Sequence, residues 1–278
     1  IYLDQSAYVH RLVVRFGMQN CHLISTLLAV NHSLSVTQSP TTPDNQCAYN
    51  EYAKDINYLS LIGSLLFTTQ TQPSIQFSVS LIAQFVGNLG ILHLAAAKHV
   101  LCYLKGMADF QLTIGQQEEG SFDLVGWNIR KSISGFIFNI VGRSISWSSK
   151  KQSVVAMSSV EAEYITSANA MKEAIWLHTL LKELDFPQTE ATTIHTDNQG
   201  YITLAGNLVS HSCAKHIDIQ HHFICKCIEQ GDIKLCYVPI KIMLADVFTK
   251  ALPCEVFVNF CKCLGVLLYI LLSGSDKK

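Results

Sequence analysis

The stretch that decides the fold is ISWSSKKQSVVAMSSVEAEYITSANAMKEAIWLHTLLKEL, residues 145–184. It opens on a short run of strand-forming residues, which predicts a strand over 144–149. A long segment with helical periodicity follows. It predicts a helix from Ser159 to about Leu184, which Pro187 ends. A strand followed by a long helix is typical of an α/β domain.

Further elements of both kinds lie on either side of this stretch. One helix is predicted at 217–230, and a last pair of short helices is predicted after the strand that follows it. Short β-rich runs between polar turns predict five more strands. These strands span 109–114, 121–127, 134–141, 192–197 and 233–238. The order predicts an α/β domain whose first strands are antiparallel.

The residues before this domain favour helices throughout. Apolar residues follow a helical stripe in 4–18, and a polar segment, 34–50, predicts a loop. Three further helices are predicted over 52–68, 73–86 and 93–105. The polar run GQQEEG at 115–120 predicts the boundary. We therefore expect a helical domain over 1–115, an α/β domain over 116–265 and a tail over 266–278.

Composition limits the classes of function. The net charge is −1 and only 15% of residues are charged. Proteins that hold many phosphates usually carry a surplus of Lys and Arg, so weak or absent nucleic-acid binding is expected. No apolar run reaches the roughly 18 residues of a membrane span. The cysteines form no CxxC pair and no signal peptide stands at Ile1, which indicates reduced thiols and disfavours an oxidising compartment. The missing first Met indicates a fragment.

Three carboxylates stand out by position. Asp197 ends a strand, where ligands gather in α/β sheets, although Asp there also caps helices. Glu161 begins the long helix, although Ser158 and Glu161 also fit a capping box. Asp246 lies among apolar residues and needs a partner, a cap or a metal. Separate carboxylates of this kind suit hard cations such as Mg²⁺.

Histidines gather later in the chain, and a zinc site is the competing interpretation there. The group comprises His211, His216, His221 and His222, with Cys213 nearby. His216 and His221 lack the i, i+4 spacing that would place both on one face of a helix. The spacing does not favour zinc.

Several long runs together resemble one family. Residues 145–184, TIHTDNQGYITLA (193–205), AKHIDIQHHFI (214–224) and YVPIKIMLADVFTKALP (237–253) resemble the RNase H region of copia-type LTR-retrotransposon polyproteins. Upstream runs resemble the end of reverse transcriptase and its connection to RNase H. These runs are DQSAYVHRLVVRFGM (4–18), YLSLIGSLLFTTQTQPSIQFSVSLIAQF (58–85) and HLAAAKHVLCYLKG (93–106).

The resemblance implies a mixed five-stranded sheet with flanking helices. It also implies Mg²⁺-dependent hydrolysis of RNA in an RNA–DNA hybrid, with Mn²⁺ as the alternative ion. By motif, Glu161, Asp197 and Asp246 match catalytic, metal-binding carboxylates of the family. In such sites two ions about 4 Å apart hold the attacking water and the leaving oxygen.

The first strand departs from the family. There the sequence LVG leads into an acidic motif, whereas here it continues directly into Trp127-Asn128-Ile129-Arg130. Asp123 lies several residues too early, and at about 3.3 Å per residue it falls roughly 15–20 Å short. We therefore expect an inactive remnant whose sheet is frayed at 126–133. A still-active RNase H and a domesticated binding module are the alternatives.

A second departure concerns arginines. Cys, His or Gln stands at many positions where the resemblance leads us to expect Arg. Single cytosine-deamination transitions convert CGN codons in this way, so we hypothesise a decayed, pseudogene-like copy. The positions are Gln72, Cys102, His178, Cys213, Gln220, Cys225 and Cys254.

Overall fold

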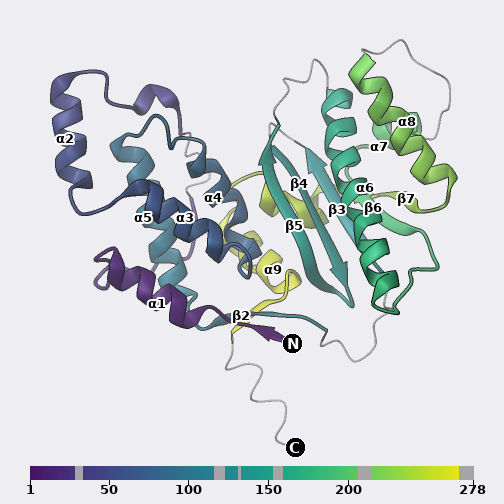
Figure 1. Ribbon diagram of the computed structural model, residues 1–278, viewed down its shortest axis with the longest axis horizontal. Coiled ribbons are helices and arrows are strands. Elements are labelled where there is room, and N and C mark those ends of the chain that lie inside the picture. Colours follow the sequence, from purple (N-terminus) through teal and green to yellow (C-terminus); the bar gives the residue numbers. More distant parts are fainter. Residues whose placement is uncertain (29–33, 116–122, 131–132, 153–158, 206–214, 269–278) are drawn as a thin grey trace, which may run out of the picture. The chain divides into compact units, whose positions relative to one another are not determined.

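The computed structural model describes residues 1–28, 34–115, 123–130, 133–152, 159–205 and 215–268 (Figure 1). Within these ranges the side chains of 130, 159–161, 204, 215–218 and 268 are not described. The chain forms two compact units. The first combines Ile1–Thr113 with Lys250–Lys278, and the second is Ile114–Thr249.

The first unit is built mainly from helices. Caps fix their starts: Thr42 precedes Pro43 in α2, and the Asn57 side chain accepts a hydrogen bond from the Ser60 N–H at 2.9 Å in α3. The longest helix, α5, is fully buried along one side and forms the centre of the core. The helices are α1 (Ser6–Arg15), α2 (Pro43–Ala53), α3 (Tyr58–Thr68), α4 (Gln76–Ala83), α5 (Ile91–Gly106) and α9 (Cys254–Cys263). Short 3₁₀ turns, η1 (Val36–Gln38) and η2 (Pro73–Ile75), connect them.

A small antiparallel sheet joins both ends of the chain in this unit. Its order is β1 (Tyr2–Leu3), β2 (Phe110–Thr113) and β8 (Val266–Leu268). The α9 residue Phe257 also packs edge-on against Tyr103 of α5, with 5.8 Å between ring centroids. Residues 250–265, which the sequence placed in the α/β domain, therefore belong to the first unit. Pairing with β2 and burial against α5 hold them there.

The second unit contains the mixed five-stranded sheet that the sequence predicts. Its order is β5-β4-β3-β6-β7. The first three strands pair antiparallel, and β6 and β7 run parallel to β3. The strands are β3 (Val125–Arg130), β4 (Ile133–Ile140), β5 (Arg143–Lys151), β6 (Thr192–Thr196) and β7 (Ile233–Tyr237). The expected α/β fold class with flanking helices is confirmed.

Helices cover the sheet and create its core. Figure 1 shows α6 (Ser159–Glu183) against the sheet with α8 (Lys215–Glu229) beside it, and both contacts are close. The short helix α7 (Gln199–Ala205) follows β6, and two 3₁₀ turns, η3 (Ile240–Ile242) and η4 (Leu244–Phe248), follow β7. The core includes Phe138, Met171 and Ile194, none of which is exposed. No helix in the described part of the chain is long and apolar enough to cross a membrane.

The shortened first strand is fully paired where it is described. Each residue of β3 from Val125 to Arg130 has a partner in β4, and Val125 to Trp127 also pair with β6. The neighbouring residues 131–132 lie outside the described part. Fraying of the sheet at 126–133 therefore stays a prediction, which backbone hydrogen exchange would test. Every residue of β3 is paired in the structure.

Candidate functional site

A polar cavity lies at the carboxyl ends of the two parallel strands β6 and β7. Its volume is about 420 Å³. Asp197, Asn198 and Gln199 follow β6, and Tyr237 ends β7. Glu163, in the first turns of α6, lines it as well. Strand ends of parallel sheets are the usual place for ligands, so this is the candidate site of the second unit.

Within α6, the glutamate that reaches this cavity is Glu163. Its side chain is only 3% exposed. The predicted ligand Glu161 lies two residues earlier, about 200° around the helix, and its side chain is outside the described residues, as is the capping partner Ser158. Helical periodicity could have revealed Glu163, because it begins the buried stripe of α6. This stripe comprises Glu163, Ser167, Ala170, Ala174, Leu177 and Leu181.

Asp197 follows the end of β6, as its predicted place requires, and the hydrogen bond that caps α7 comes from the next residue. The side chain of Asn198 accepts a hydrogen bond from the Tyr201 N–H at 3.0 Å and so caps α7. Asn is among the best residues for this position. Asp197 is half-buried and lines the cavity. Its carboxylate and that of Glu163 are therefore brought to the same site from β6 and α6.

Asp246 is buried, at 4% exposed, but it is not among the residues that line the cavity. Its turn, η4, packs on the other face of the sheet from α6. The Ser134 hydroxyl bonds to Thr166 of α6 at 2.7 Å, so the next residue, Gly135, faces away from α6. A Cβ atom on Gly135 would meet Phe248 at 2.9 Å. Of the three predicted carboxylates, Asp197 lines the cavity, Asp246 is not among the lining residues, and the side chain of Glu161 is outside the described residues.

From the first strand, the side chain directed toward the α6 side is Asn128. It is completely buried, and its Nδ2 donates to the Ser167 hydroxyl at 2.6 Å. Ser167 lies one helical turn after Glu163. Continuing the β3–β6 register from Trp127 and His195 places Asn128 level with Thr196, one residue before Asp197.

The first strand therefore presents a neutral amide to α6 beside Ser167, and Asn128 itself is not among the residues that line the cavity. The Oδ1 atom of Asn128 has no hydrogen-bond partner among the described residues. Asp123, the acid that precedes β3, is exposed and outside the strand. The expectation that the first strand brings no carboxylate to the site agrees with this arrangement for residues 123–130.

Neutral groups occur on both faces of the sheet near the ends of β3 and β6. Burial lowers the pKa of His195, so its imidazole is neutral at pH 7. The ring stacks on Trp127, with centroids 5.2 Å apart. Burial also raises the pKa of Tyr201, and the charge of Glu163 adds to this effect. Two acids beside neutral groups form an environment that attracts a cation.

The histidine group of the competing zinc interpretation lies partly outside the described residues. Residues 211–214 and the side chain of His216 lie outside that part. His221 packs near Tyr164, and its ring lies 3.7 Å from the Cys225 sulfur. No group of three or more His, Cys, Asp and Glu side chains that could hold a metal ion occurs among the described residues.

Comparisons with known proteins find relatives that match almost the whole chain. No protein-family model matches it. It is 35% identical over 269 residues to the retrovirus-related Pol polyprotein from transposon TNT 1-94 of Nicotiana tabacum, which covers 94% of this chain and 20% of that protein. Pol polyproteins from the Arabidopsis thaliana transposons RE1 and RE2 are 32% and 31% identical, each over 96% of this chain. The chain belongs to the copia-type retrotransposon Pol polyproteins.

This chain spans about a fifth of the length of these Pol polyproteins. A solved foamy viral protease–reverse transcriptase in complex with double-stranded DNA is 14% identical, with a TM-score of 0.39. That similarity covers 65% of this chain and 31% of the viral chain. The family resemblance inferred from the sequence motifs is confirmed by the transposon relatives.

Proposed function

We propose that the second unit is the RNase H domain of a copia-type Pol polyprotein and that this copy has lost its nuclease activity. The ancestral reaction is Mg²⁺-dependent hydrolysis of the RNA strand in an RNA–DNA hybrid. One observation carries the proposal: the first strand presents Asn128 toward α6, where a shared metal ligand would need a carboxylate.

The charge of the site decides how many ions it can hold. Glu163 and Asp197 supply two negative charges at the cavity, and Asn128 adds none. Two divalent ions carry four positive charges and repel each other strongly at about 4 Å. The donor set fits one hard divalent cation, held by Glu163 and Asp197. That ion would supply Lewis acidity, and the side chains would orient it.

A hybrid-cleavage assay tests the loss of activity. The full chain is incubated with an RNA–DNA hybrid and Mg²⁺ or Mn²⁺, and RNA fragments are measured. We expect no turnover above that of the Asp197→Asn variant. Turnover that this variant abolishes would overturn the proposal and favour an active RNase H with a substitute ligand.

Metal binding tests the residue assignment separately. Mn²⁺ affinity is measured by its paramagnetic signal in the wild-type chain, in Glu163→Gln and in Glu161→Gln. We expect Glu163→Gln to weaken Mn²⁺ binding at least tenfold, because a charged ligand is lost from a two-carboxylate site. Glu161→Gln is the matched control and should bind as the wild type does. The reverse result would restore Glu161 as the ligand.

Decay of arginine codons supports the same proposal. Where the structure describes these positions, smaller side chains now fill them: Gln72 donates to the Phe110 carbonyl at 3.2 Å, and Cys102 is buried. Lost arginines also remove phosphate contacts, consistent with the net charge of −1. Reading the coding DNA tests this: TGN and CAN codons at the seven positions are expected, and other codons would contradict it.

A further inference from the structure

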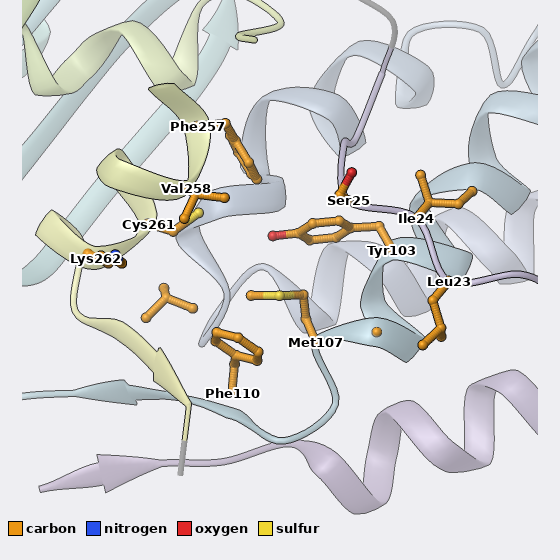
Figure 2. A pocket seen from close by; sticks show the side chains of 12 residues that line it. Leu23, Ile24, Ser25, Tyr103, Met107, Phe110, Phe257, Val258, Cys261 and Lys262 are labelled. Carbon is orange, nitrogen blue, oxygen red and sulfur yellow. The ribbon is translucent and has the colours of Figure 1, made fainter. Parts of the chain in front are cut away.

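An apolar cavity of about 360 Å³ lies inside the first unit, separate from the polar site of the second (Figure 2). Its walls come from the end of α5, from β2 and β8, from α9 and from the extended segment 23–25. The volume is within the range of pockets that bind small molecules.

Aromatic, sulfur-containing and aliphatic side chains together form most of the wall. In Figure 2 the Tyr103 ring lies across the middle of the view, with Phe257 above it and Met107 and Phe110 below. The Tyr103 hydroxyl points toward the α9 side, where Cys261 lies. Such a lining favours an apolar ligand, which gains about 0.8 kcal/mol, or roughly a fourfold affinity, for each buried methylene.

The walls are held in place by contacts on both sides. Tyr103 and Phe257 meet edge to face, which fixes α9 against α5. The Lys105 ammonium donates to the carbonyls of Gln19 and Cys21 at 2.6 and 2.9 Å. That contact fixes the chain just before the wall segment 23–25. The cavity is therefore largely preformed, which lowers the entropy cost of binding.

Only one of the lining residues is charged. This residue is Lys262 of α9, whose side chain is exposed. Burial raises the pKa of the Cys261 thiol to about 12, so this neighbour stays neutral and does not compete for the ammonium. An apolar interior beside a single cation matches a ligand that has an apolar body and one anionic group.

We propose that this cavity binds a small amphiphilic anion, with its apolar chain among Tyr103, Met107 and Phe257 and its acidic group beside Lys262. The probe is octanoate. Its alkyl chain supplies the apolar surface, and its carboxylate supplies the charge. Octanol and octylammonium share the chain and differ only in the head group, so they separate the apolar contribution from the ionic one.

Methyl NMR of the full chain, labelled with ¹³C at methionine methyl groups, gives a residue-specific readout. Octanoate should shift the Met107 signal saturably, with affinity in the order octanoate, octanol, octylammonium. Hexanoate should bind about sixteenfold more weakly, because two methylenes are lost. Met171 and Met243, both fully buried in the second unit, should not shift. No Met107 shift, or equal shifts at Met171, would overturn the proposal.

Two substitutions test the two halves of the ligand. Lys262→Gln should weaken octanoate binding about threefold, in the range of exposed ion pairs, and leave octanol binding unchanged. Lys54→Gln makes the same charge change at an exposed residue outside the cavity and should have no effect. Val258→Trp should weaken both ligands by filling space. Equal octanoate affinity in all three variants would contradict the assigned site.

Discussion

Replacing Asn128 by Asp tests the missing first-strand carboxylate most directly. The substitution changes one amide into an acid of the same size, at a completely buried position level with Thr196. The Ser167 hydroxyl, which now accepts from the amide, can rotate and donate to a carboxylate. The site would then hold three acids, counting Glu163 and Asp197.

Without metal, the Asn128→Asp variant should be less stable than the wild type. A buried charge without compensation costs about 3–5 kcal/mol, and protonation limits this cost. The introduced carboxyl lies near Glu163, so its folded-state pKa should rise above the unfolded value of about 3.9. Below about pH 4 the introduced carboxyl is protonated in both the folded and the unfolded state. As the pH rises, the unfolded state ionises more easily, so the free energy of unfolding falls and the deficit of the variant should grow toward pH 8.

Mg²⁺ should offset part of this deficit. A ligand at one hundred times its Kd stabilises the folded state by about 2.7 kcal/mol. Urea unfolding at pH 8, with and without saturating Mg²⁺, measures the difference. Asn139→Asp is the matched control, because Asn139 is also buried in the same sheet but pairs with Val125 at the start of β3, away from Asn128. If Mg²⁺ leaves the urea midpoint of folded Asn128→Asp unchanged, or shifts both variants equally, the assigned geometry is refuted.

Three other predictions concern stability and are checked by urea or thermal unfolding. Asn198→Ala should cost about 1 kcal/mol by removing the α7 cap, whereas Gln199→Ala should have little effect, and equal losses would contradict the cap. Asp185→Gly should stabilise by about 0.5–1 kcal/mol, because Asp185 ends α6 at φ 65°, where glycine is favoured; a loss of stability would contradict this. Burial lowers the pKa of His178 and His195, so both imidazoles resist protonation in the folded state. The free energy of unfolding should therefore be highest above pH 6.5 and fall toward pH 5. His195→Phe should reduce that fall, and an unchanged pH dependence would exclude His195 as its cause.

Local patterns in the sequence determined the order and type of most elements, but α2 (Pro43–Ala53) begins within the segment 34–50, where the sequence predicts a loop. The strand at 192–197 and the helix from Ser159 are found within one or two residues of their predicted ends. Such patterns depend on neighbours in the chain, because alternation and helical periodicity report which side of one element is buried. The family and the absence of the first-strand acid also follow from the order of motifs alone.

Only the tertiary structure decided which residues meet. Glu163 lines the cavity because the packing direction of α6 buries this side of the helix. Asp246 is buried in η4, which packs on the face of the sheet away from α6, and it is not among the residues that line the cavity. Residues 250–268 join the first unit because β8 pairs with a strand more than a hundred residues earlier. Each outcome depends on contacts between distant segments, which no local pattern encodes.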